Sequence, residues 1–172
     1  MAGFKTFSLN EVMDAAEMTT YFVQQATVIK AVDESVTSST VLQADNELVM
    51  AVAANTDYFV ECFLIYSADP AGDLKSDWDG PAGATFDWVA DAITPTATAT
   101  VDQVSRTAQS MSSTPAHGGI TNNSTILVAL HKGMLRVGGN AGNLTLTWAQ
   151  QVSSANATFV RANSTLIVTR VS

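Results

Sequence analysis

The sequence has one cysteine, no long apolar run and few charged residues, and each shortage excludes a class of protein. Cys62 is the only cysteine among 172 residues, so an intramolecular disulfide framework is excluded. No apolar run of about 18 residues occurs that could form a membrane-spanning helix. Met1 is followed by Ala-Gly-Phe-Lys rather than by a basic segment and an apolar signal core. We therefore expect a protein made in the cytosol, with no membrane partner, that is stabilised by packing.

Charged residues make up only 14% of the chain and are unevenly distributed. The 16 acidic residues all lie between Glu11 and Asp102, whereas the segment after Asp102 carries only basic charges. This asymmetry indicates either complementary surfaces on two copies of the chain, or strands from both halves that interleave and mix the charges. Nucleic-acid binding is not expected, because the net charge is −8 and no basic cluster with interleaved aromatic residues occurs.

Residues 4–26 are the only long stretch with a helical pattern. Capping signatures occur at 8–11 (Ser-Leu-Asn-Glu) and 14–17 (Asp-Ala-Ala-Glu), each with an N-cap oxygen three residues before a carboxylate. The second signature predicts a helix over 15–25, in which the candidate partner-binding residues share one face at spacings of three and four: Met18, Tyr21, Phe22 and Gln25. A helix this short does not persist alone in water, so this face packs either on its own body or on a partner.

The remainder of the chain alternates apolar and polar residues as β-strands do. Strands are predicted at 47–53, 58–66, 84–93, 97–104, 124–131, 133–137, 143–150, 157–161 and 164–171. Residues 54–57 (Ala-Asn-Thr-Asp) predict a hairpin or a sheet corner, and 67–83 a long loop. The fold class is therefore all-β, an antiparallel β-sandwich or jelly roll over 33–172 with a short N-terminal helical arm over 1–32. The predicted core includes Cys62, Leu64, Trp88, Leu146 and Trp148.

No constellation of residues points to catalysis or to a cofactor. His117 and His131 each lack a second histidine or cysteine at metal-ligand spacing. The loop over 67–83 contains four aspartates, but it lacks the continuous ligand pattern and the closing glutamate of an EF-hand, so calcium binding remains the weaker alternative to a structural role. Neither a nucleophile elbow nor a phosphate-binding loop occurs. We therefore expect a non-enzymatic protein with no catalytic residue, no cofactor and no metal.

Two blocks of the sequence resemble a known family. The first is the arm, EVMDAAEMTTYFVQQATVI at 11–29, and the second is the body, with Asp-Leu-Lys-x-x-Trp at 73–78, Gly-Pro-Ala-Gly-Ala-Thr at 80–85 and Trp-Ala-Gln at 148–150. Both resemble segments of virion structural proteins from tailed phages that infect actinobacteria. Members of that family are capsid-associated or minor tail proteins.

The resemblance implies a structural component of the virion. Its leading form is a capsid decoration (cement) protein, a homotrimer that binds the assembled head through the arm, with the major capsid protein or neighbouring virion proteins as partners. The alternative is a tail or fibre component that binds a glycan on the host surface, with Trp78 and Trp88 as a stacking platform.

Overall fold

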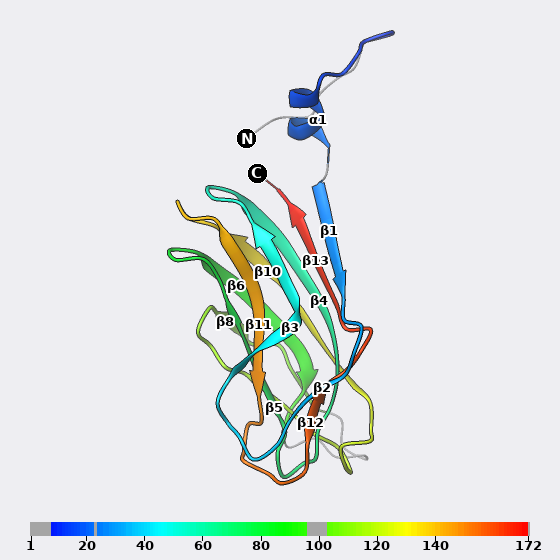
Figure 1. The fold of residues 1–172 in the computed structure, drawn as a ribbon, viewed down its shortest axis with the longest axis vertical. Coiled ribbons are helices and arrows are strands. Elements are labelled where there is room, and N and C mark those ends of the chain that lie inside the picture. The colour runs from blue at the N-terminus through cyan, green and yellow to red at the C-terminus, as the bar shows by residue number, and fades with distance from the viewer. Residues whose placement is uncertain (1–7, 23, 96–102, 172) are drawn as a thin grey trace.

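The structure is a computed structural model and describes residues 8–22, 24–95 and 103–171 (Figure 1). It contains one short helix, α1 (Ala15–Tyr21), and is otherwise built from strands. The strands are β1 (Gln24–Ile29), β2 (Glu34–Val36), β3 (Gln43–Val52), β4 (Asp57–Ser67), β5 (Leu74–Asp79), β6 (Thr85–Ile93), β7 (Val104–Ser105), β8 (Ala108–Ser110), β9 (Ala116–His117), β10 (Leu127–Arg136), β11 (Gly142–Ala149), β12 (Thr158–Val160) and β13 (Thr165–Arg170).

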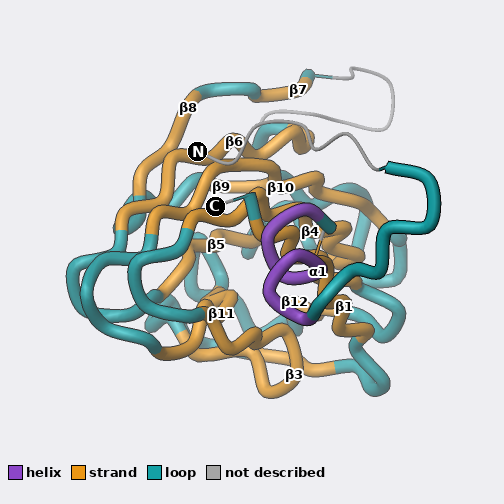
Figure 2. The backbone as a smooth tube through the Cα atoms, turned by 90° about the horizontal axis from the view of Figure 1, so that it is seen from above, coloured by secondary structure: helices purple, strands orange, loops and turns teal. Residues whose placement is uncertain are grey.

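Two antiparallel sheets form the body. The larger sheet has the order β1-β13-β4-β10-β6-β7, with β12, β2 and β8 paired off this path, and the smaller has the order β3-β11-β5-β9. Seen from the end of the molecule, the sheets lie as two layers (Figure 2). The predicted all-β, antiparallel β-sandwich with a short N-terminal helical arm is confirmed.

The core lies between the two layers and follows the alternation of the strands. On β4, the inward side chains are Val60, Cys62, Leu64 and Tyr66, all at most 2% exposed. The five residues predicted as core lie here: Cys62, Leu64, Trp88, Leu146 and Trp148 are between 0 and 3% exposed. Because each large apolar side chain buried in this way contributes about 1.5–3 kcal/mol, this layer dominates the stability of the body.

The predicted helix over 15–25 is wrong in its second half. Helix α1 ends at Tyr21, its C-cap Phe22 is extended, and Gln25 lies on strand β1, opposite Thr169 of β13. Residues 26–29 (Ala-Thr-Val-Ile) include three β-branched residues, which favour an extended chain, and β13 offers a full ladder of hydrogen bonds. Pairing with the sheet therefore overrides the local helical pattern, and the last part of the arm segment forms an edge strand of the sandwich.

In two other segments the structure differs from the sequence prediction, and in a third it decides between two predicted alternatives. The loop predicted over 67–83 contains the buried strand β5, which pairs with β11. The two strands predicted at 124–131 and 133–137 are one continuous strand, β10, which runs through Gly133. Residues 54–57 form a corner, since β3 and β4 belong to different sheets. Most of the strand predicted over 97–104 lies outside the described residues.

Candidate interaction site: the arm and the groove at its base

Helix α1 begins where the second capping signature predicts it. Asp14 Oδ1 accepts the Glu17 N–H at 2.8 Å, and the Glu17 carboxylate accepts the Asp14 N–H at 3.2 Å, which completes a capping box. The first signature forms only a turn, in which the Ser8 N–H donates to Glu11 Oε2 at 2.8 Å. The arm thus enters a defined helix at Ala15, although the helix is only seven residues long.

The described apolar side chains of the arm are largely uncovered by the body. Leu9 and Val12 are 93% and 90% exposed, and Met18 and Phe22 on the predicted face remain 52% and 51% exposed. Figure 1 shows α1 beyond the end of the sandwich, next to the start of β1. The side chain of Tyr21 lies outside what the structure describes. Of the two alternatives for this face, packing on its own body or on a partner, this arrangement favours the partner.

Strand β1 fixes the arm to the larger sheet. It pairs with β13 along its whole length, from Gln24 opposite Arg170 to Ile29 opposite Thr165. Gln25, which the sequence placed on the partner-binding face, instead donates from Nε2 to Thr169 Oγ1 at 3.1 Å. The arm is therefore a helix on a strand that is itself part of the sandwich.

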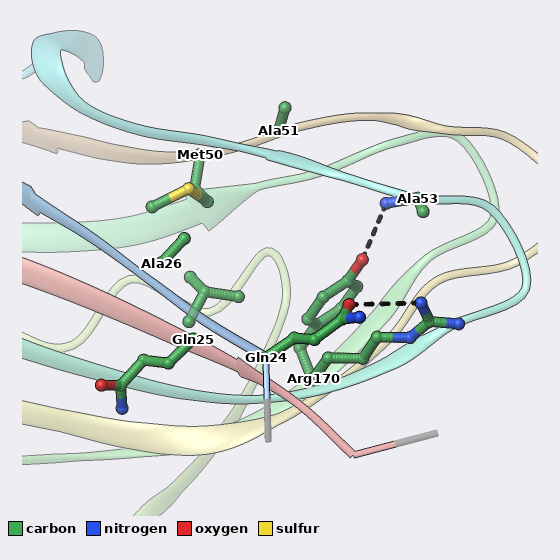
Figure 3. A pocket seen from close by; sticks show the side chains of 9 residues that line it. Gln24, Gln25, Ala26, Met50, Ala51, Ala53 and Arg170 are labelled. Atoms are coloured by element: carbon green, nitrogen blue, oxygen red, sulfur yellow. Dashed lines mark hydrogen bonds between the residues drawn. The ribbon is translucent and has the colours of Figure 1, made fainter. Parts of the chain in front are cut away.

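A groove of about 260 Å³ lies at the base of the arm, between β1 and β13 of one sheet and β3 of the other. Met50, Ala26 and Val168 give it apolar walls. At its rim, Arg170 Nη1 donates to Gln24 Oε1 at 3.5 Å, and the Tyr58 hydroxyl accepts the Ala53 N–H at 3.0 Å (Figure 3). This end of the molecule thus combines an exposed apolar helix with a small, half-polar hollow.

Basic residues of the second part of the chain pair with acidic residues of the first part. The four pairs are Arg106–Asp91 at 2.8 Å, Lys132–Glu61 at 2.7 Å, Arg136–Asp87 at 3.0 Å and Arg161–Asp33 at 2.7 Å. The strands from both halves therefore interleave and mix the charges, as in the second alternative above. The charge asymmetry along the chain no longer argues for complementary surfaces between copies.

The two histidines meet in the core, which the sequence pattern did not predict. His117 and His131 are each 1% exposed, and their ring centroids lie 5.5 Å apart. His117 Nε2 lies 2.7 Å from Ser76 Oγ, whereas neither ring nitrogen of His131 has a hydrogen-bond partner among the described residues. Burial lowers the pKa of His117 to about 4 and lowers that of His131 well below its ordinary value. The strand predicted over 124–131 ends at His131, whereas the structure places this residue in the middle of β10 with its side chain in the core.

Two aspartates of segment 67–83 accept hydrogen bonds from backbone N–H groups of the fold. Asp73 Oδ1 accepts the Gly119 N–H at 2.7 Å, and Asp77 Oδ1 accepts the N–H groups of Trp78 and Ser112 at 2.7 and 3.2 Å. Within residues 8–22, 24–95 and 103–171, no group of three or more His, Cys, Asp or Glu side chains is placed to hold a metal ion.

The stacking platform suggested for a glycan is wrong. Trp78 is 1% exposed and Trp88 is 3% exposed, because both side chains face the core and pack around His131. No helix in the described part of the chain is long and apolar enough to span a membrane.

Comparison with known proteins gives no family. No protein-family model matches the chain, and no curated protein matches its sequence. Among solved structures, the infectious bursal disease virus Gx strain is similar over 87% of this chain and 40% of that chain, at 9% identity and a TM-score of 0.22. The VP2 subviral particle of the same virus is similar over 86% and 40%, at 10% identity and a TM-score of 0.21. The chain thus spans about two fifths of the length of these structures. TM-scores this low support no inference about the function of this chain.

Proposed function

We propose that the chain is a non-enzymatic structural protein of a phage virion, a capsid decoration protein that binds the assembled head through its N-terminal arm. The resemblance of the arm and of the motifs at 73–85 and 148–150 to virion proteins of tailed phages supplies the setting. The observation that carries the proposal is the exposure of Met18 and Phe22 on a capped helix beyond the end of the sandwich.

The arm is suited to docking rather than to independent stability. A seven-residue helix is marginal in water, so its apolar face gains order only when a partner covers it. Burying Met18 and Phe22 would contribute about 1.5–3 kcal/mol each before the ordering of their side chains is subtracted. One arm therefore binds weakly, and several arms presented by one oligomer bind firmly through multivalency. This is the physical reason for the proposed trimer.

The test is a deletion that ends before the sandwich begins. Removing residues 1–22 leaves β1 and its ladder with β13 intact, so the body should keep its melting temperature. The truncated protein should lose attachment to phage heads assembled without the protein. Truncated protein that occupies these heads to the same extent as the full chain would contradict the docking role.

A pair of point variants separates the apolar face from the length of the arm. Met18→Ser with Phe22→Ser should reduce occupancy on the heads while leaving the sandwich unchanged. The matched control is Val41→Ser with Val152→Ser, which removes exposed apolar side chains elsewhere (76% and 56% exposed). Equal loss of occupancy in both variants would argue against a specific role of the arm.

Copy number decides between the head and the alternative of a tail or fibre component. A decoration protein occurs at every equivalent site of the shell, whereas a tail or fibre component occurs in a few copies. Quantitative gel or mass analysis of purified particles against the major capsid protein measures this ratio.

A further inference from the structure

A buried lysine lies among three carboxylates where the arm joins the sandwich. Lys30 directly follows β1, and its Nζ lies 2.9 Å from Asp45 Oδ1, 3.0 Å from Glu34 Oε2 and 3.6 Å from Glu47 Oε2. The side chains of Lys30 and Asp45 are both 0% exposed. An amine and a carboxyl group are thus held in contact without access to bulk water.

The two carboxylate oxygens of Asp45 have different surroundings. Oδ1 accepts the backbone N–H groups of Glu47 at 3.0 Å and Leu48 at 2.8 Å, besides the contact with Lys30. Oδ2 is buried and has no hydrogen-bond partner among the described residues. A buried anionic oxygen without a partner is unfavourable, and conversion to a neutral amide removes that penalty.

From this geometry we propose that Lys30 and Asp45 condense to an isopeptide bond between Nζ and Cγ. The amine lone pair attacks Cγ, and the charge that develops on Oδ1 is held by the N–H groups of Glu47 and Leu48, as in an oxyanion hole. The bond from Cγ to Oδ2 then breaks, and Oδ2 leaves as water. The ammonium and the carboxylate are converted to an amide and one water molecule, so no oxidant or other co-reactant is needed.

Glu34 is the group that moves the protons. Burial lowers the pKa of Lys30, but the hydrogen bonds and charges of Asp45 and Glu34 raise it by more, so the ammonium form prevails before reaction. A proton must therefore leave Nζ before attack, and Glu34 Oε2, at 3.0 Å, is placed to accept it and to return it to the departing oxygen. In the amide product, Oδ1 keeps its two backbone donors.

Proximity and the exclusion of water make this pair reactive where others are not. Holding the two groups in contact removes the entropic cost of a bimolecular condensation, and a dry site prevents hydrolysis of the product. Lys132 and Glu61 form an even shorter contact of 2.7 Å, but they are 55% and 33% exposed and remain hydrated. This exposed pair stays an ion pair and serves as an internal control.

The bond would strengthen the attachment of the arm. Lys30 continues directly from β1 of the larger sheet, and Asp45 lies on β3 of the smaller sheet, so the link joins the two layers at the root of the arm. Force transmitted through the arm acts first on β1, an edge strand held by β13. A covalent link behind that strand keeps it from being peeled away from the body.

Mass spectrometry of the purified full chain tests the proposal. We expect an intact mass lower by one water molecule than that of the unlinked chain, no tryptic cleavage after Lys30, and fragment ions that map the link to Lys30 and Asp45. Lys132 and Glu61 should be unlinked in the same digest. Folded protein that keeps its full mass after long incubation at neutral pH, or a water loss mapped elsewhere, would overturn the proposal.

Variants separate the bond from the fold. Lys30→Met combined with Asp45→Asn removes the amine and both buried charges, while the amide oxygen of the new side chain can still accept the N–H groups of Glu47 and Leu48, so the chain should fold and show its full mass. Glu34→Gln retains the shape of the side chain but not the proton acceptor, and should slow formation of the link on the order of 100-fold, as expected for loss of a general base. An unchanged rate in Glu34→Gln would overturn the role given to Glu34.

Discussion

The ring centroids of His117 and His131 lie 5.5 Å apart inside the core, with both side chains buried. His131 packs on Trp78 and Trp88, and His117 on Tyr66 and Ser76, and none of these contacts supplies a carboxylate that could compensate a positive charge. Protonation of either ring would place a charge in an apolar layer and bring two like charges together. The folded state therefore holds both imidazoles neutral.

The first prediction is a loss of stability in mild acid. Since the unfolded chain binds protons at each histidine near pH 6.5 and folded His117 does so only near pH 4, stability falls as the pH decreases through this window. The slope reaches about 1.4 kcal/mol per pH unit for each histidine that stays neutral. Urea unfolding at several pH values measures it.

A single variant isolates this contribution. His131→Leu removes a titrating ring whose nitrogens have no hydrogen-bond partner among the described residues, so the slope between pH 6.5 and 4 should become shallower. The parent is needed as the reference because other buried groups also make stability depend on pH. Burial raises the pKa of Asp73 and Asp77, so these two carboxyl groups lower stability as the pH rises, which is opposite in sign to the effect of the histidines. Parallel slopes in the parent and the variant would show that folded His131 takes up its proton at about the same pH as the unfolded chain, and would contradict the prediction.

The second prediction concerns Gly133, which lies opposite Trp88 across β10 and β6. A Cβ at this position would overlap the backbone of Asp87 and Trp88, so the strands can approach only with glycine here. Gly133→Ala should destabilise the protein by about 1–3 kcal/mol through strand displacement. The matched control is Gly139→Ala, because a Cβ added at Gly139 would have no atom within 4 Å apart from its own chain neighbours. This variant should have little effect in thermal unfolding.

The strands of the body were predictable from the sequence where burial follows alternation, and were not predictable where a contact with another strand decides the structure, as at Gly133. Alternation predicted the positions of β4, β6, β11 and β13, because there the pattern reflects burial on one face. The break predicted between 124–131 and 133–137 does not occur, because glycine at 133 is required by the close approach of Asp87 and Trp88 of β6. Strand β5 was missed for a related reason: Trp78 is buried by its place beside Leu146 of β11, and no local pattern encodes that neighbour.

The candidate site was predictable in part. The capping box of Asp14 and Glu17 is a local motif, and it begins the helix where the sequence indicates. The end of the helix was not predictable from its own residues, because β13 competes for the chain from residue 24 onward. The cluster around Lys30 depends on segments that the fold brings together, so no spacing in the sequence reveals it.

The third prediction concerns Trp148, which is fully buried between the sheets. Trp148→Ala should cost about 3–5 kcal/mol through the cavity it leaves. Its Nε1 has no hydrogen-bond partner among the described residues, so Trp148→Phe should cost less than truncation. Val152→Ala, at a position 56% exposed, is the control. A Trp148→Ala variant with the parent melting temperature would show that this face does not carry the core.

The fourth prediction concerns self-association. Because four basic residues of the second half already pair within the chain, oligomers held by complementary charge are not expected. In the absence of heads, the free face of the arm is the surface expected to hold copies together, in exchange for its contact with the head. An apolar contact of this kind is insensitive to salt, since screening acts on charges. Light scattering at low and high salt should then give the same mass, above that of a monomer.

The arm variants complete this test. Met18→Ser with Phe22→Ser should shift the protein toward monomer at both salt concentrations, whereas Val41→Ser with Val152→Ser should leave the mass unchanged. Dissociation by salt alone would instead restore a role for charge complementarity. A parent protein that stays monomeric at high concentration would contradict self-association in solution, and the multivalent binding proposed above would then require the phage head to assemble the copies. Occupancy on heads at increasing protein concentration distinguishes that case, because independent single arms bind without cooperativity, whereas preformed oligomers bind as units.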